Sequence, residues 1–202
     1  MSVTASLIVG YLTGSLPTAD LLARLRGVDL RAAGTGNPGA NNALRVGGRS
    51  LGAGVLFVEI VKGAAAVWIG RRIGEDSGGA LAAIGATVGN VYNPWFRFRG
   101  GKGLAITGGI LLAAWPLLVP VLALVIGGAA AILRRSGPAS LIALATYVLV
   151  ALLGLVADLP TGWGLDSPGW LAVMAVCSSA AMVPKHWVDT VRVPGDDRPR
   201  MA

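Results

Sequence analysis

Residues 97–103 read Arg97-Phe98-Arg99-Gly100-Gly101-Lys102-Gly103, and apolar segments long enough to cross or enter a lipid bilayer flank them on both sides. The three glycines predict a turn whose backbone exposes successive N–H groups, and the lysine and arginines add fixed positive charge. This glycine-lysine turn is therefore predicted to bind a phosphate, a phosphoryl group or a carboxylate. The rest of the chain is expected to be the scaffold that holds it.

The composition indicates an integral membrane protein. Of the 202 residues, 54% are hydrophobic and only 13% are charged, which is too apolar for a surface that faces water. The net charge of +7 comes from 17 Lys and Arg against 10 Asp and Glu, and these cations lie between the apolar segments. Because no basic stripe alternates with aromatic residues, the pattern favours cytoplasmic loops over a nucleic-acid-binding face.

Six apolar segments define the expected membrane spans, at residues 3–25, 51–70, 78–92, 104–133, 140–157 and 169–183. The fourth contains Trp115-Pro116. It is either one long crossing or two short ones that fold at this pair and enter the membrane only part of the way. Two crossings place nearly all Lys and Arg on one side, which is the arrangement that the positive-inside rule favours. We therefore predict an all-α polytopic membrane helix bundle of about seven transmembrane helices, with the N-terminus outside and the C-terminus cytoplasmic.

The chain is predicted to form one integral-membrane domain over residues 1–202, with a short cytoplasmic tail at 185–202. The N-terminus has no basic region ahead of its apolar segment, so we expect no cleaved signal peptide. The single cysteine, Cys177, lies in an apolar segment and excludes a disulfide within the chain. Small residues at 78–92 predict close helix packing.

Charged residues inside the apolar segments have two interpretations each. Asp20 follows a break at Gly14-Ser15-Leu16-Pro17, so it either faces protein or a wet cavity, or reaches the interface from a kinked helix. Glu59 and Lys62 share one helix face, which favours a structural ion pair for Glu59. Lys62 is left open between that pair and attraction of a nearby phosphate.

Two polar regions flank these segments. Residues 27–49 contain Gly34-Thr35-Gly36-Asn37-Pro38-Gly39, which is either a solvated turn with an Asn helix cap or a hydrogen-bonding cup for a small polyol or phosphate. His186, the only histidine, is either inert at the interface or a hydrogen-bond partner at the cytoplasmic site. Without a second histidine or a carboxylate cluster beside it, a metal site is not expected.

With these pieces in order, the sequence resembles the PlsY-type bacterial acyl-phosphate:glycerol-3-phosphate acyltransferases, integral membrane enzymes of phospholipid synthesis. The resemblance extends over nearly the whole chain, and its motifs occur in family order. They are Gly14-Ser15-x-Pro17, Gly27-x-Asp29-Leu30-Arg31-x-x-Gly34-Thr35-Gly36-Asn37-Pro38-Gly39-Ala40-x-Asn42-x-x-Arg45, Glu59-x-x-Lys62-Gly63, Pro94-x-Phe96-x-Phe98-Arg99-Gly100-Gly101-Lys102-Gly103-Leu104-Ala105, His186 and Arg192.

The resemblance implies transfer of a fatty acyl group from acyl phosphate to the 1-hydroxyl of glycerol 3-phosphate, giving lysophosphatidic acid and phosphate, without a cofactor or metal. Because phosphate is a good leaving group, no covalent nucleophile is needed, and catalysis consists of positioning and charge stabilisation. The implied catalytic residues are Lys102, His186, Asn37 and Ser140. The implied substrate- and phosphate-binding residues are Thr35, Gly36, Asn42, Arg45, Gly100, Gly101, Gly103 and Lys62.

The expected partners are acyl phosphate, glycerol 3-phosphate and the lipid bilayer, for a monomer in the bacterial inner membrane that binds no nucleic acid.

Four positions depart from the family pattern: Thr35, where the family usually has Ser, Asn41 for Thr, Asn90 for His and Asp189 for Asn. The departures at Asn90 and Asp189 leave a catalytically weak homologue as one alternative. A second alternative is a small organic-anion membrane carrier, which would also need broken helices and buried polar groups.

Overall fold

The computed structural model describes residues 2–191, and within them the chain is helical and contains no strand. The all-α prediction is confirmed for this part of the chain. The helices are α1 (Ser2–Ser15), α2 (Thr18–Arg24), α3 (Ala40–Val91), α4 (Leu104–Ala114), α5 (Leu118–Leu133), α6 (Ser136–Leu153) and α7 (Pro168–Val191), with a 3₁₀ turn, η1 (Pro94–Phe96), between α3 and α4.

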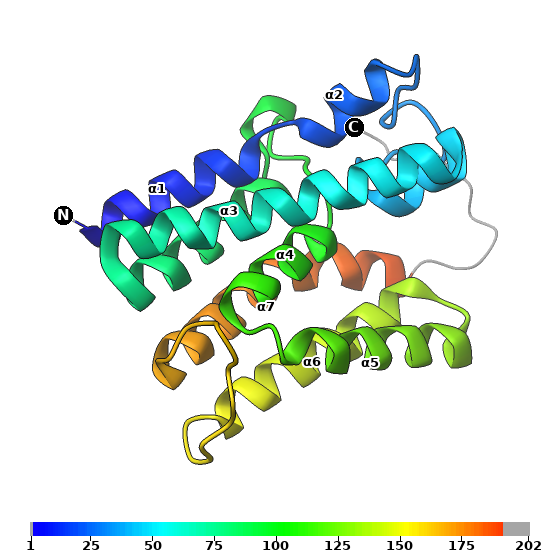
Figure 1. Ribbon diagram of the computed structural model, residues 1–202. Coiled ribbons are helices and arrows are strands. Elements are labelled where there is room, and N and C mark those ends of the chain that lie inside the picture. Colours follow the sequence, from blue (N-terminus) through cyan, green and yellow to red (C-terminus); the bar gives the residue numbers. More distant parts are fainter. Residues whose placement is uncertain (1, 192–202) are drawn as a thin grey trace.

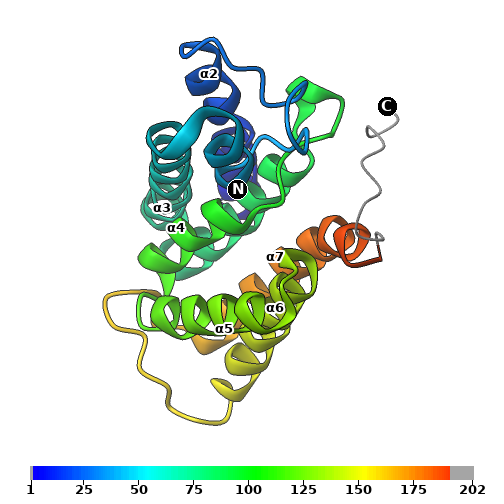
Figure 2. The same cartoon turned by 90° about the vertical axis from the view of Figure 1, so that its right-hand side faces the viewer.

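The helices pack as two groups joined through α3, α4 and α7. Helices α1 and α2 lie along α3, which also packs against α4, while α5 and α7 flank α6. Figures 1 and 2 show these groups from two sides, with the α3–α7 contact connecting them. The polar loops that follow α2 and α3 meet at one end of the bundle.

Helix α3 is a hairpin rather than one rod. Fifty-two helical residues would extend about 78 Å, far beyond a hydrocarbon core of about 30 Å. Non-helical backbone at Gly74 and Glu75 reverses the chain, and a further break lies at Gly48. A Cβ on Gly70 would lie 2.3 Å from the carbonyl oxygen of Gly78, so the two limbs touch beside the turn. The predicted spans at 51–70 and 78–92 are these two limbs.

Small residues bring α1 and the second limb of α3 into backbone contact. A Cβ added to Gly10 would lie 2.1 Å from the Ala82 carbonyl oxygen, and one on Gly14 would lie 2.0 Å from that of Ala86. The four-residue spacing on both helices is the pattern that lets membrane helices approach closely. The close packing predicted for residues 78–92 is therefore present.

Helix lengths separate full spans from partial ones. Three helices, α3, α6 and α7, are long and apolar enough to cross a membrane among the described residues. Helices α4 and α5 have 11 and 16 residues, shorter than the roughly 20 that a crossing needs. They meet near Trp115-Pro116, where the sequence predicts a fold between two short passes. The first apolar segment is broken at Leu16-Pro17, as expected.

Two predicted boundaries are wrong. The sixth helix covers Ser136–Leu153 instead of 140–157. The seventh does not end at Val183 but continues through Pro184 to Val191, so residues 185–191 of the expected tail are helical. Arg135 stabilises the last turn, because its Nη2 donates to the carbonyl oxygen of Thr190 at 2.6 Å. Arg192 and the remaining tail lie outside the described residues.

Candidate active site

Two backbone hydrogen bonds hold the glycine-lysine turn against the end of α3. The N–H of Gly100 donates to the carbonyl oxygen of Val91, and that of Gly101 to Asn90, both at 3.0 Å. The expectation that these two N–H groups stay free is therefore wrong, and phosphate binding by Gly100 and Gly101 stays a prediction. Gly100 is required for another reason, because a Cβ there would lie 1.9 Å from the Asn90 carbonyl oxygen. Gly103, the N-cap residue of α4, adopts φ of 86°, in the left-handed region.

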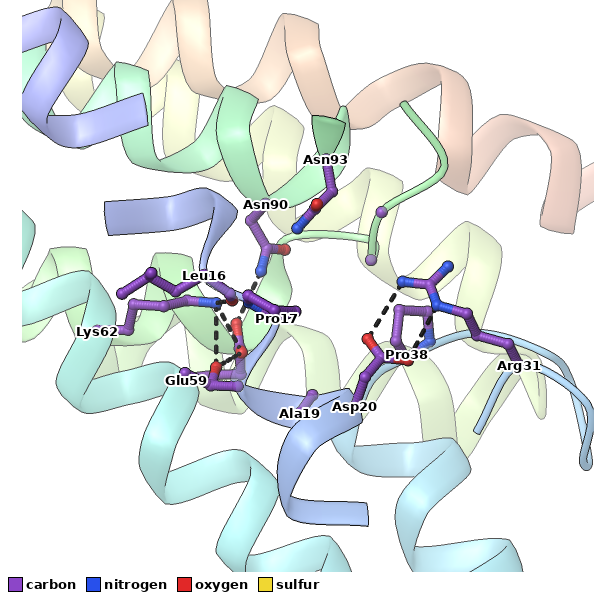
Figure 3. A pocket seen from close by; sticks show the side chains of 13 residues that line it. Leu16, Pro17, Ala19, Asp20, Arg31, Pro38, Glu59, Lys62, Asn90 and Asn93 are labelled. Carbon is purple, nitrogen blue, oxygen red and sulfur yellow. Dashed lines mark hydrogen bonds and ion pairs between the residues drawn. The ribbon is translucent and has the colours of Figure 1, made fainter. Parts of the chain in front are cut away.

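A buried ion pair lies behind this turn (Figure 3). Lys62 Nζ is 2.7 Å from Glu59 Oε1 and 3.1 Å from the carbonyl oxygen of Leu16. Thr18 Oγ1 and Asn90 Nδ2 donate to the two carboxylate oxygens of Glu59, at 2.8 and 2.7 Å. The structural pair favoured for Glu59 is therefore present. The Lys62 ammonium is therefore bound within the protein by Glu59 and Leu16. Phosphate binding by Lys62 stays a prediction.

A second ion pair attaches the loop after α2 to the glycine-lysine turn. Arg31 donates to both carboxylate oxygens of Asp20, at 2.9 and 3.2 Å, and to the carbonyl oxygen of Arg99 at 2.7 Å. Its guanidinium also stacks 3.4 Å from the centroid of the Phe96 ring. Asp20 therefore faces protein, and the alternative of an interfacial Asp20 is excluded. A cavity of about 10 Å³, roughly the size of one water, separates the two ion pairs (Figure 3).

The backbone orders the start of the same loop. The N–H groups of Arg31 and Ala32 donate to Asp29 Oδ1 at 2.9 and 3.2 Å and lower the pKa of that carboxyl. Asn42 then ties the loop to α3, since its Nδ2 donates to the carbonyl oxygen of Leu30 at 2.9 Å and its Oδ1 accepts from the N–H of Thr35 at 2.8 Å. Asn42 is therefore a residue that shapes the loop.

Beside the turn lies a cavity of about 890 Å³, a size typical of sites for small molecules. Its polar end is lined by Thr35, Asn37, Asn41, Asn42, Arg45, Glu59, Asn90, Lys102, Ser136, Ser140 and His186. Its apolar part extends between α4, α5 and α6 and is lined by Leu104, Ile106, Leu111, Val119, Leu122, Ala123, Ile126, Ala143, Leu144 and Tyr147. One cavity therefore joins a polar, basic end to an apolar limb.

Most of the predicted site residues line this cavity. Asn37 is 9% exposed, and its Oδ1 has no hydrogen-bond partner within residues 2–191. Ser140 is buried, and its hydroxyl donates to the carbonyl oxygen of Ser136 at 2.8 Å, which leaves lone pairs as acceptors. Gly101 and Gly103 also line it, whereas Gly36, Lys62 and Gly100 do not. Gly36 has φ of 69° and serves the turn of the loop.

Lys102 and His186 meet across the cavity wall. His186 is 1% exposed, and its Nε2 lies 3.2 Å from the carbonyl oxygen of Lys102. His186 is therefore a buried hydrogen-bond partner beside Lys102 and not an exposed interfacial residue, and its part in catalysis stays a prediction. The Lys102 ammonium forms an ion pair with Asp189, one turn beyond His186 on α7. Sequence reasoning did not assign this pair or the Arg31 contacts, although the spacing of His186 and Asp189 predicts one helix face.

These features define a helical integral membrane protein with a basic, amide-rich site at one end of an apolar cavity. The model of the glycerol-3-phosphate acyltransferase family matches residues 4–194. The chain therefore belongs to the glycerol-3-phosphate acyltransferase family.

Curated relatives carry the same description. A glycerol-3-phosphate acyltransferase of Symbiobacterium thermophilum is 34% identical over 186 residues, which cover 92% of this chain and 88% of that protein. One of Myxococcus xanthus is 43% identical over 148 residues, 72% of this chain and 77% of that protein. One of Rhodopseudomonas palustris is 45% identical over 114 residues, 55% of this chain but only 58% of that protein, so this match spans less than two thirds of the relative.

The fold also matches a solved structure. The crystal structure of PlsY, an integral membrane glycerol 3-phosphate acyltransferase, in its glycerol 3-phosphate form has a TM-score of 0.78 and 27% sequence identity to this chain. The match covers 94% of this chain and 90% of the crystallised one. The lysophosphatidic acid form of the same enzyme has a TM-score of 0.77.

Proposed function

We propose that this protein transfers a fatty acyl group from acyl phosphate to the 1-hydroxyl of glycerol 3-phosphate, in phospholipid synthesis. The family and the two ligand forms of the solved relative support glycerol 3-phosphate as the acceptor. The observation that carries the proposal is the cavity of about 890 Å³, whose basic end continues into an apolar limb. A phosphorylated headgroup and a fatty acyl chain need these two environments side by side.

In the proposed reaction the acceptor hydroxyl oxygen attacks the acyl carbonyl carbon, and the bond from that carbon to the phosphate oxygen breaks. The hydroxyl proton passes to the departing phosphate, so the products are 1-acylglycerol 3-phosphate and inorganic phosphate. Arg45 and Lys102 are the Lys and Arg side chains that line the cavity, and they would stabilise the phosphate charges. Asn37 Oδ1, which has no hydrogen-bond partner among residues 2–191, would accept a hydrogen bond from the acceptor hydroxyl.

The remaining residues of the polar end would position the reactants. Thr35 and His186 both line the cavity. Thr35 comes from the loop before α3, and His186 comes from α7. Ser140 lies on α6, where the polar end meets the apolar limb. Holding both reactants in one orientation lowers the barrier, because their translational and rotational entropy is already lost on binding and not at the transition state.

We also propose a topology of about seven crossings, with the N-terminus outside and the C-terminus cytoplasmic, for a monomer in the bacterial inner membrane. Contacts among the basic loops support a shared side: Arg31 reaches Arg99, Lys102 pairs with Asp189, and Arg135 donates to Thr190. At the other end of the bundle the backbone N–H of Asp166 donates to Asp76 at 2.7 Å.

The test is direct. Purified protein in detergent is given palmitoyl phosphate and labelled glycerol 3-phosphate, and we expect labelled lysophosphatidic acid. Flux of label into proteoliposomes without product would support the organic-anion carrier, and binding without product would support a catalytically weak homologue. Lys102→Ala is the matched variant that we expect to be inactive, because it removes positive charge from the site while leaving membrane insertion intact.

A further inference from the structure

The two cations that line the cavity differ in their surroundings. Arg45 is exposed, and its guanidinium forms no ion pair with a carboxylate among residues 2–191. The Lys102 ammonium, in contrast, is paired with Asp189, whose side chain is 18% exposed. Asp189 does not line the cavity. Lys102 therefore lies between the cavity and the Asp189 carboxylate, which is not part of the cavity wall.

The backbone of Asp189 is held in place. Arg135 Nη2 lies 3.5 Å from the carbonyl oxygen of Asp189 and 2.6 Å from that of Thr190. A Cβ on Gly137, in the first turn of α6, would lie 2.8 Å from the backbone nitrogen of Thr190, so the two helices touch there. The backbone at the end of α7 therefore cannot move away from Lys102 without breaking these contacts.

Lys102 is the movable partner of this pair. Its side chain, which is 23% exposed, carries a compact charge at the end of a flexible four-carbon stem. Its main chain is fixed, since its carbonyl oxygen contacts His186 Nε2 at 3.2 Å. The ammonium can thus turn between the carboxylate of Asp189 and the cavity while the backbone stays in place.

We propose that Asp189 is a positioning residue that competes with phosphate for Lys102, so that anion binding draws the ammonium into the cavity and phosphate release returns it to Asp189. This inference rests on the proposed function, in which every turnover leaves an inorganic phosphate beside Lys102. A second negative charge that shares the lysine weakens phosphate binding and hastens its departure. The chemical class concerned is a phosphate mono- or dianion.

The experiment measures the dissociation constant of inorganic phosphate for the purified full-length protein in detergent. Asp189→Asn keeps the size of the side chain and removes its charge, and we expect phosphate to bind about three- to tenfold more tightly. The Michaelis constant for acyl phosphate should fall in parallel, and kcat should fall where phosphate release limits turnover. Asp158→Asn, an exposed change of the same net charge, is the control and should leave the constant unchanged.

A double variant shows whether Asp189 acts through Lys102. In a Lys102→Met background, Asp189→Asn should have no further effect on phosphate binding, which a purely structural role would not predict. An equal or weaker affinity in Asp189→Asn with an unchanged melting temperature overturns the proposal, as does the absence of phosphate binding to both proteins. Because phosphate binding is measured without an acyl donor, a failure of this proposal is distinct from a failure of acyl transfer.

Discussion

Replacing Lys62 by Met tests whether this lysine serves the fold or the substrate. The side chains of Lys62 and Glu59 are only 4% and 6% exposed, and Lys62 Nζ lies 2.7 Å from Glu59 Oε1. Removing one partner of a buried pair costs about 3–5 kcal/mol. Thr18 and Asn90 still donate to Glu59 in the variant, so we expect a loss near the lower end, about 3 kcal/mol.

At about 2–4 °C per kcal/mol for a chain of this length, Lys62→Met should lower the melting temperature by about 6–12 °C. Removing both charges in Glu59→Gln/Lys62→Met should recover most of that loss, because no unpaired charge is left buried. Thermal unfolding in detergent measures the stabilities, and acyl transfer at a temperature below both transitions gives the Michaelis constant for glycerol 3-phosphate.

The double variant decides between the two roles of Lys62. If Glu59 and Lys62 form only a structural pair, the Michaelis constant of the double variant for glycerol 3-phosphate stays close to that of the wild type. A double variant that is no more stable than Lys62→Met would refute the ion-pair reasoning. One that regains stability yet keeps a strongly raised Michaelis constant would return Lys62 to the phosphate site.

Three further predictions concern the cavity and the glycine-lysine turn beside it. Arg45→Ala should raise the Michaelis constant for glycerol 3-phosphate about thirtyfold, because a lost charge-assisted phosphate contact costs about 2 kcal/mol; an unchanged constant in steady-state assays would remove Arg45 from the site. Gly100→Ala should abolish acyl transfer, since its Cβ would lie 1.9 Å from the Asn90 carbonyl oxygen, whereas Gly127→Ala, with open space around it, should be active; equal activities would contradict the packing argument. Tyr147→Ala should raise the kcat/KM ratio of stearoyl over myristoyl phosphate, because this buried ring lines the apolar limb, and Tyr147→Phe should keep the wild-type ratio; matching profiles for all three proteins would exclude the ring as a limit on chain length.

Much of the fold was predictable from the distribution of apolar residues. The spans at 51–70 and 78–92 follow from hydropathy, and the small residues at 78–92 predict close packing. The structure shows this packing where Gly10 and Gly14 meet Ala82 and Ala86. The continuation of α7 through Pro184 was not predictable, since it depends on Arg135 binding the carbonyl oxygen of Thr190 from another helix.

The site was predictable in composition and less so in its bonding. Thr35, Asn37 and Arg45 do line one cavity with Lys102 and His186, as their motifs imply. The glycine-lysine turn differs because the N–H groups of Gly100 and Gly101 bond to carbonyl oxygens at the end of α3, a contact that no local pattern reveals. The partners of Arg31 and Asp189 come from segments distant in sequence, so they emerge only in three dimensions.

The choice of acyl donor tests the central claim most directly. Purified protein with labelled glycerol 3-phosphate is given either palmitoyl phosphate or palmitoyl coenzyme A, and lysophosphatidic acid and inorganic phosphate are both quantified. We predict one phosphate released for each lysophosphatidic acid formed from palmitoyl phosphate, no product from the thioester, and no product with Lys102→Ala. Transfer from the thioester alone, or palmitoyl phosphate consumed without acylated glycerol 3-phosphate, would contradict the proposed function.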